Sequence, residues 1–375
     1  MRTKLKTSDV GSELVLLSWG ETHARSPEAA AEEAYAAIAE ACGSRESSPL
    51  QERVFGDLSA APAVATGRDR ALRGSSLWSV PPTFVAGAPL GRSGLAGITV
   101  IAARGASRLV TEGEARLGRV VESASARFLG LADVGRFAPA GPAPGPAEDA
   151  ARSIGAAEAL LAREGFSFRD VARTWFFLRD ILDWYGPFND VRSAAFRRIG
   201  LIGPDGDGQI PASTGIEGRN ARGGWCALDL LAMQARAGGR LAVRRLHSRK
   251  QNEATEYGSA FARAIEVSLG DARYIFVSGT ASIDARGATV HRGDFESQAR
   301  YTLEVVEALL EGAGARLAHL AQATAFIKNP DDGRTFERVL ARAGLAEAPI
   351  VATVADVCRE DLLFEIDATA VVPAG

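Results

Sequence analysis

The sequence predicts an α+β fold made of three consecutive related units, and three observations support this prediction. Pro81, Pro211 and Pro349 each open a strand, a loop and a second strand of similar length. Residues 150–164 and 295–312 have helical patterns, and each is followed by a glycine and a strand-like run. The order within a unit is strands, long helix, strand, short helix and two strands. This order favours an α+β sandwich over a doubly wound sheet.

The length of 375 residues accommodates three domains of ordinary size. We expect the units at residues 1–115, 116–245 and 246–375, and the first is the most degenerate copy. In that first copy the patterns predict a helix at 27–42 and a strand at 50–58.

Composition and charge argue against several functional classes. The formal net charge is −3 with both signs interspersed, which does not suggest a nucleic-acid groove. The sequence also has no run of eighteen apolar residues, the length needed to cross a membrane. Residues 14–17 form an apolar run too short for the core of a signal peptide, so we expect a cytoplasmic protein. A Pro/Gly/Ala-rich stretch at 138–146 predicts an exposed loop.

The cysteines and histidines form no pattern typical of a metal site. Cys42, Cys226 and Cys358 are an odd set without metal-like spacing, and a disulfide framework is not expected in so large a core. The four histidines are scattered along the chain. Since there is no dinucleotide-binding fingerprint either, we expect neither a metal ion nor an organic cofactor.

One acid stands out in the last segment of the chain. Residues 349–372 read as two strands joined by a polar turn at 359–361, and Glu365 lies in the second strand between Phe364 and Ile366. A carboxyl group among apolar neighbours loses hydration, so it is paired or keeps its proton with a raised pKa. A raised pKa is what a proton donor near neutral pH requires.

Comparison of the three copies shows that this acid is a feature of one copy. Sixteen positions on from each leading proline stand Gly97, Ala227 and Glu365, so the acid occurs in the third copy only. This favours a catalytic role for Glu365. The alternative is an edge-strand acid that points into water or pairs with an arginine.

A first group of candidate binding residues lies in the most aromatic stretch of the chain, at 180–198. Tyr185, Asn189 and Arg192 have polar side chains at spacings of four and three, and they share one face if helical geometry persists past Gly186 and Pro187. An arginine and a tyrosine on one face near a cleft can hold a carboxylate. A solvated helix face is the alternative explanation.

A second group follows in the segment at 210–230. Ser213 and Thr214 precede a glycine, and Arg219 comes shortly after. Hydroxyl groups, glycine and arginine together suit an anion site, although a glycine-rich turn explains them without a ligand. Further on, the strand at 274–284 ends in small and hydroxyl residues, including Gly279, where a backbone can approach a ligand closely.

The third unit resembles the YjgF, or reactive-intermediate deaminase, family, whose units have a chorismate mutase-like fold. The resemblance lies in the segments YGSAFARAIEV, YIFVSGTASID, QAR, ATVADV and LLFEIDATA, which follow the order of that family. Members form homotrimers with ligand sites between subunits, so three fused copies imply a pseudo-trimer and a monomeric chain. Those deaminases place an arginine at the position of Val351, which argues against imine deamination here.

The whole chain is similar to the chorismatases, which have this three-unit architecture. The segments that carry the similarity are RTWFFLRDILDWYGPFNDVR, PASTGI, YGSAF, VSGTASI and ADVCREDLLFEID. The resemblance implies cleavage of the enolpyruvyl ether of chorismate, in a cleft between the central and C-terminal units. It also implies that Glu365 is the catalytic acid. Protonating the terminal methylene carbon gives an oxocarbenium ion that water or a neighbouring hydroxyl captures, and no cofactor is needed.

Chorismate carries two carboxylates, and burying them requires cations and hydroxyl donors. The candidates that the sequence offers for binding are, from the central unit, Tyr185, Arg192, Ser213, Thr214 and Arg219 and, from the C-terminal unit, Tyr257, Ser259 and Gly279.

Product type is expected to depend on the position seven residues before the acid. Chorismatases that release 3-hydroxybenzoate carry a cysteine there and those that release the dihydroxycyclohexadiene acid an alanine; here it is Cys358. The resemblance therefore favours conversion of chorismate to pyruvate and 3-hydroxybenzoate. A small core residue is the structural alternative for Cys358. The alternatives for the whole protein are a hydrolase that yields 3,4-dihydroxycyclohexa-1,5-diene carboxylate and a non-catalytic small-ligand binder.

Overall fold

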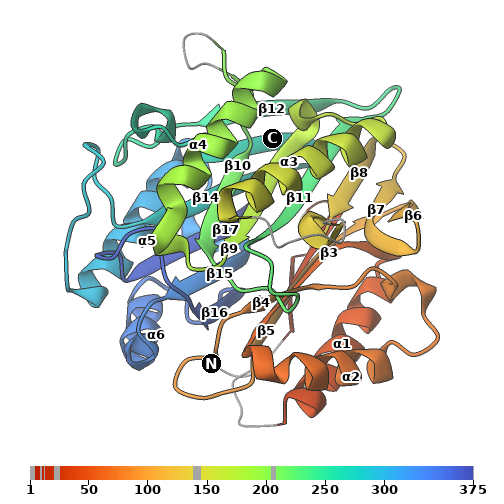
Figure 1. The fold of residues 1–375 in the computed structure, drawn as a ribbon, viewed down its shortest axis with the longest axis horizontal. Coiled ribbons are helices and arrows are strands. Elements are labelled where there is room, and N and C mark those ends of the chain that lie inside the picture. Colours follow the sequence, from red (N-terminus) through yellow and green to blue (C-terminus); the bar gives the residue numbers. More distant parts are fainter. Residues whose placement is uncertain are drawn as a thin grey trace.

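Three mixed β-sheets surround a common centre, and each carries its helices on its outer side (Figure 1). The computed structural model describes residues 5–8, 11, 13–20, 26–137, 145–203 and 208–374. Most of the loop predicted at 138–146 lies outside the described residues, as does the side chain of Tyr257. The architecture is the α+β arrangement of three units that the sequence predicts.

The first unit forms a five-stranded sheet in the order β1-β2-β5-β3-β4, covered by two helices. The predicted helix at 27–42 is present as α1, which begins at Pro27 behind the capping residue Ser26. The predicted strand at 50–58 is shifted toward the N-terminus, as β3. The elements are β1 (Leu5–Ser8), β2 (Leu14–Gly20), α1 (Pro27–Gly43), β3 (Ser47–Gly56), α2 (Ala61–Ala71), β4 (Thr83–Ala86) and β5 (Leu95–Arg104).

The central unit forms a six-stranded sheet in the order β10-β9-β11-β8-β7-β6. Its helices are the two long ones at the top of Figure 1. The elements are β6 (Ala106–Glu112), β7 (Ala115–Glu122), β8 (Ala126–Leu131), α3 (Pro146–Arg163), β9 (Val171–Leu178), α4 (Ile181–Ile199), β10 (Ala212–Glu217) and β11 (Cys226–Ala235).

The C-terminal unit forms a six-stranded sheet in the order β12-β13-β14-β17-β15-β16. Its first strand, β12, begins before the unit boundary expected at 245/246, just as β6 begins before the boundary expected at 115/116. The elements are β12 (Leu241–Leu246), β13 (Ala264–Leu269), β14 (Ala272–Ala281), α5 (Phe295–Glu311), β15 (Leu320–Ile327), α6 (Gly333–Arg342), β16 (Ile350–Val354) and β17 (Phe364–Pro373).

The last segment differs from the two strands and short polar turn that the sequence predicts. β16 ends at Val354 and β17 begins at Phe364, so residues 355–363 form a longer loop. The reason is topological, because β15 lies between these two strands in the sheet. The chain must cross over β15 before it can return antiparallel to it, and a tight turn is too short for that.

Equivalent phenylalanines from the three units meet at the centre of the molecule. The ring of Phe55 lies 6.2 Å from the ring of Phe177 and 6.2 Å from the ring of Phe326. Each pairs across its sheet with one of the three equivalent positions found in the sequence, Gly97, Ala227 and Glu365 respectively. The units are therefore related by a pseudo-threefold arrangement with an apolar axis.

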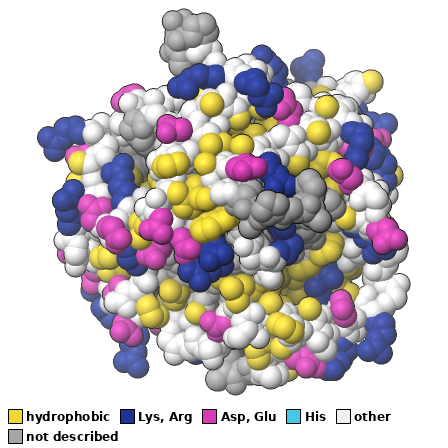
Figure 2. Space-filling model, viewed as in Figure 1, with side chains coloured by type: hydrophobic (Ala, Val, Ile, Leu, Met, Phe, Trp, Pro, Cys, Tyr) yellow, Lys and Arg dark blue, Asp and Glu magenta, His cyan; other side chains and the backbone are white. Residues whose placement is uncertain are grey.

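This arrangement creates three contacts between units. We call them the first seam (first and central units), the second seam (central and C-terminal units) and the third seam (C-terminal and first units). On the face shown in Figure 2, basic and acidic side chains are interspersed over the surface, and no broad field of one sign is seen. No helix in the described part of the chain is long and apolar enough to span a membrane.

Candidate active site

A cavity of about 280 Å³ lies at the second seam. It is bounded by helix α4 and strand β10 of the central unit and by β14, β17 and three loops of the C-terminal unit. Its lining residues are Tyr185, Asn189, Arg192, Ser213, Gly215, Ser259, Phe261, Arg263, Gly279, Ala281, Ile283, Cys358, Arg359 and Glu365.

Glu365 is the one carboxyl group among the residues that line this cavity. Its strand, β17, lies between β14 and β15, so the alternative of an exposed edge-strand acid does not apply. The side chain is 4 % exposed, and it makes no hydrogen bond or ion pair to any residue that the structure describes. Burial, and next the charge of Asp367, raise the pKa of Glu365 to about 8, although Arg173 and Arg263 act in the opposite direction.

Gly279 gives the Glu365 carboxyl the room it occupies. Gly279 sits where β14 departs from regular pairing with β17, between Val277 and Thr280. A Cβ atom at position 279 would lie 2.1 Å from Oε1 of Glu365. Any larger residue would therefore displace the acid, which explains the glycine predicted at this site.

The face of α4 predicted from the sequence lines the cavity. The helix has non-helical torsions at Trp184 and then continues through Pro187, so Tyr185, Asn189 and Arg192 share one side. The two backbone amides at the start of the helix donate to the Glu217 carboxylate, which fixes its position.

Arg192 is the most buried cation of this group. It is 1 % exposed, and it donates to Oδ1 of Asn189 over 2.7 Å and to the Ser213 hydroxyl over 3.3 Å. Ser259 of the C-terminal unit donates to the same Asn189 oxygen over 3.1 Å. Asn189 therefore links the two units at the cavity wall, and this residue was on the predicted face without being assigned to the site.

Two further arginines line the cavity, and the sequence-based prediction missed both. Arg263 is 2 % exposed and donates to the carbonyl oxygen of Asn252 over 2.8 Å, while its guanidinium lies 5.3 Å from the ring centre of Phe261. Arg359 donates to the carbonyl oxygen of Gly287 over 2.9 Å. The sequence gives only weak indications of these two residues. Arg263 interrupts a run of small and apolar residues before β13, and Arg359 follows Cys358 directly.

Cys358 lies in the loop before β17, at the cavity wall. Burial and the neighbouring Glu365 raise the pKa of its thiol to about 12, so the thiol is neutral. A neutral thiol is a weak nucleophile, because the thiolate is the reactive form. The loop is held in place by Gln298, which donates to the Asp361 carbonyl and accepts from the Leu363 amide, both over 2.8 Å.

Two predicted binding residues lie elsewhere. Arg219 does not line the cavity; its guanidinium pairs with Asp180 at 2.6 Å and is half exposed, because the chain turns outward after β10. Thr214 faces away from the cavity and donates to Asp367 over 2.9 Å. Tyr257 ends a short 3-10 helix, and its side chain lies outside the described residues.

The described residues offer no group of three His, Cys, Asp or Glu side chains that could hold a metal ion. The chemistry that this cavity supports is proton donation from one carboxyl group, next to several cations that can hold an anionic ligand.

Comparison with known proteins relates this architecture to characterised families. The endoribonuclease L-PSP family model matches residues 258–372. A RutC family protein of Pyrococcus horikoshii is 31% identical over 98 residues, which are 26% of this chain and 78% of that protein. The crystal structure of a chorismatase covers 86% of this chain and 93% of its own, with a TM-score of 0.59 and 24% identity. At 24% identity, the similarity to this crystal structure shows a shared fold.

Two proteins of Streptomyces hygroscopicus match more than one unit. A 3-hydroxybenzoate synthase is 32% identical over 231 residues, which are 54% of this chain and 64% of that protein. A chorismatase is 29% identical over 221 residues, which are 52% of this chain and 60% of that protein. The matches thus span less than two thirds of the length of these two relatives.

The match to the RutC family protein, which covers 78% of that protein at 31% identity, places this chain in the YjgF/RidA (L-PSP) superfamily. Within that superfamily, the chain is similar over more than half of its length to the 3-hydroxybenzoate synthase and the chorismatase of Streptomyces hygroscopicus.

Proposed function

We propose that the protein cleaves chorismate to pyruvate and 3-hydroxybenzoate, with Glu365 as the proton donor. The observation that carries the proposal is a buried carboxyl group with a pKa of about 8, alone among cations in a cavity between two units. At neutral pH such a group holds a proton it can give up, whereas an ordinary glutamate has already lost it.

In the proposed reaction, the proton of Glu365 moves to the terminal methylene carbon of the enolpyruvyl group, and the vinyl double bond supplies the electron pair. The ether oxygen stabilises the resulting oxocarbenium ion. The neighbouring ring hydroxyl captures this ion and gives up its proton, which closes a cyclic ketal across the two ring oxygens. The bond between the ring and the former hydroxyl oxygen then breaks, so that this oxygen leaves as the carbonyl oxygen of pyruvate, while the bond between the ketal carbon and the former ether oxygen breaks and that oxygen takes up the hydroxyl proton. The ring carbon that bears the former ether oxygen loses its hydrogen as a proton, and the ring becomes aromatic. That proton returns to the Glu365 carboxylate, so chorismate is converted into its two products without net consumption of water.

The carboxylates of the substrate match the cations of the cavity. Arg192, Arg263 and Arg359 line it from three different segments of the chain, and the first two are almost fully buried. Buried guanidinium groups bind carboxylates strongly because water competes little. We assign the substrate carboxylates to these three arginines, with Tyr185, Ser213 and Ser259 as hydroxyl donors.

Cys358 supports the aromatic product within the proposal. Its neutral thiol occupies little volume and offers no strong hydrogen-bond partner to a water molecule at the cavity wall. Capture of the oxocarbenium ion by the ring hydroxyl is then favoured over capture by water. The match to the 3-hydroxybenzoate synthase points the same way.

The decisive experiment measures pyruvate release from chorismate with a lactate-dehydrogenase readout. We expect release by the wild-type protein and a loss of at least about 100-fold in Glu365→Gln, which keeps the shape of the side chain but has no transferable proton. Because the acid must be protonated, kcat/KM should fall as the pH rises through about 8. Near-normal release by Glu365→Gln contradicts the mechanism, and no release by the wild type favours a non-catalytic binder.

Chromatography of the aromatic products tests the second part of the proposal. We expect 3-hydroxybenzoate from the wild type and a shift toward the dihydroxycyclohexadiene acid in Cys358→Ala. If the wild type gives only the dihydrodiol, the protein is a hydrolase. An unchanged product ratio in Cys358→Ala removes that residue from the argument.

We also propose that the protein is a monomer located in the cytoplasm. The three units already supply each other with the interfaces that a homotrimer of single units would need. A molar mass of one chain in solution is therefore expected from light scattering.

A further inference from the structure

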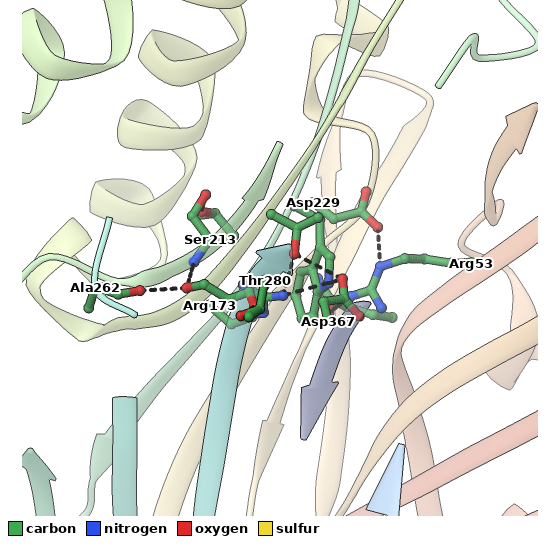
Figure 3. Close-up of polar contacts among 12 residues, drawn as sticks. Arg53, Arg173, Ser213, Asp229, Ala262, Thr280 and Asp367 are labelled. Atoms are coloured by element: carbon green, nitrogen blue, oxygen red, sulfur yellow. Dashed lines mark hydrogen bonds and ion pairs between the residues drawn. The ribbon is translucent and has the colours of Figure 1, made fainter. Parts of the chain in front are cut away.

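A buried ion pair lies directly behind the proposed catalytic acid. Asp367 follows Glu365 by two residues on β17, so both side chains are on the same face of the strand. Oδ2 of Asp367 lies 3.3 Å from Nη2 of Arg173, and the same oxygen accepts from the indole N–H of Trp175 over 3.1 Å and from the Thr214 hydroxyl over 2.9 Å. Figure 3 shows Arg173 reaching Asp367 across the second seam.

Neutral residues occupy the position of Arg173 at the other two seams. Each of the strands β3, β9 and β15 has an irregularity in its pairing near its N-terminal end, and the first residues after it are Gln51, Arg173 and Gln322. The Gln51 amide donates to two carbonyl groups of the central unit, and the Gln322 amide donates to two carbonyl groups of the first unit. At the first seam the counterpart of Asp367, Asp229, forms its ion pair with Arg53 instead, over 3.0 Å. A glutamine at the position of Arg173 is therefore sufficient at both of the other seams.

This difference argues that Arg173 has a role other than holding the seam together. Two charges buried together lose hydration, and a buried ion pair often stabilises a protein no more than a neutral pair of similar shape. Arg173 and Asp367 are 1 % and 5 % exposed. Desolvation lowers the pKa of Arg173 to about 10, which still leaves the guanidinium charged at neutral pH.

The charges around Glu365 act in opposite directions. Asp367 on β17 raises the pKa of Glu365, while Arg173 on β9 and Arg263 before β13 lower it, and the Cys358 thiol is neutral. Nη1 of Arg173 is buried and has no hydrogen-bond partner in the described part of the chain. It is thus available to a carboxylate that forms nearby.

We propose that Asp367 and Arg173 are positioning residues for the proton transfer. The fixed charge of Asp367 favours the protonated form of Glu365 before the reaction, and Nη1 of Arg173 stabilises the Glu365 carboxylate that remains once the proton has moved to carbon. The pair itself neither gains nor loses a proton. This inference rests on the proposed function for its chemistry, but the coupling between the three side chains can be measured without any substrate.

The test is a carboxyl-carbon NMR titration of the full chain labelled in glutamate, in which the Glu365 signal is the one missing from Glu365→Gln. In Asp367→Asn we expect the midpoint of the Glu365 titration to fall by about one pH unit or more, because a like charge is removed and Arg173 is no longer balanced. The high-pH limit of kcat/KM should move by the same amount, with the low-pH plateau retained. A midpoint that stays or rises overturns the inference.

Two further variants make this test decisive. Thr369 is buried on the same face of β17, and Thr369→Val changes no charge. In this control variant the midpoint of the Glu365 titration should equal that of the wild type. If Asp367→Asn does not fold, the double variant Arg173→Gln/Asp367→Asn replaces it, because glutamine stands at the position of Arg173 at the other two seams. In the double variant the midpoint of the Glu365 titration should still fall below that of the wild type, but by less than expected for Asp367→Asn alone. A higher midpoint in this double variant also overturns the inference. A shifted midpoint in a protein that releases no pyruvate would instead count against the proposed function alone.

Discussion

The first and second seams are built alike, yet the cavity of about 280 Å³ lies at the second. Each has a buried aspartate at the same strand position, Asp229 and Asp367, and each aspartate accepts from a threonine hydroxyl of the preceding unit. At the first seam the residue two places before the aspartate is Ala227, and the neighbouring hollow measures about 10 Å³. At the second seam it is Glu365. Both seams therefore share an aspartate that contributes to the contact between units, whereas the acid and the space beside it are features of the second seam.

The third seam is closed by packing. A Cβ atom on Gly97 would lie 2.6 Å from Cγ1 of Val351 and 2.7 Å from the carbonyl oxygen of Trp19. Val351 is the position at which the deaminases of the superfamily were expected to carry an arginine. Here that position is filled by an apolar contact between units, which leaves no room for a carboxylate.

The largest effect is expected from placing an acid at the first seam. Ala227 is fully buried in the core, so Ala227→Glu places a carboxylate among closely packed apolar side chains. We expect it to destabilise the protein by about 3 to 5 kcal/mol and to add no activity. Chemical denaturation measures the loss, and Ala227→Leu separates the effect of charge from that of volume. Normal stability of Ala227→Glu would show that the first seam can also accommodate a buried acid, as the second seam does.

A second variant removes the space beside the acid at the second seam. Gly279→Ala forces the Glu365 carboxyl out of its position, since the new methyl group would overlap Oε1. A displacement of this size is expected to reduce kcat by about 100-fold with little loss of stability, because the carboxyl end of a side chain can move. Gly155→Ala, in open space on helix α3, is the matched control and should keep full activity. Full activity of Gly279→Ala would mean that the carboxyl position is not critical.

The smallest effect is expected from opening the third seam. Val351→Ala removes two methyl groups from a fully buried contact, which should cost about 2 kcal/mol of stability. Pyruvate release measured at saturating chorismate should be unchanged, since this seam has no proton donor. A marked fall in release at normal stability would show that the third seam takes part in the reaction.

The fold and the acid were accessible from the sequence for physical reasons. Repeated proline-led strands and helical patterns record the hydrophobic periodicity that each unit needs for its core. Glu365 was identifiable because it interrupts a strand that is apolar in the other two copies. The face of α4 was also predicted, since helical spacing alone brings Tyr185 and Arg192 together.

The rest of the site depends on contacts between units, which local patterns do not encode. Arg263 and Arg359 reach the cavity from separate loops, and only the assembled seam shows that they face Arg192 across the same space. Arg219 was wrongly included because it follows Ser213 closely in sequence, whereas the chain directs it outward to Asp180. The loop at 355–363 was predicted as a tight turn because strand order cannot be read from alternation alone.

The covalent fusion of the three units has a consequence for how such a site can arise. In a symmetric homotrimer, any substitution is made at three places at once, so an acid beside the central phenylalanines would be introduced in triplicate around one axis. In a single chain, Glu365 faces Phe326 once, and its counterparts Ala227 and Gly97 stay apolar. Loss of symmetry thus lets one subunit boundary specialise while the remaining two keep the assembly folded.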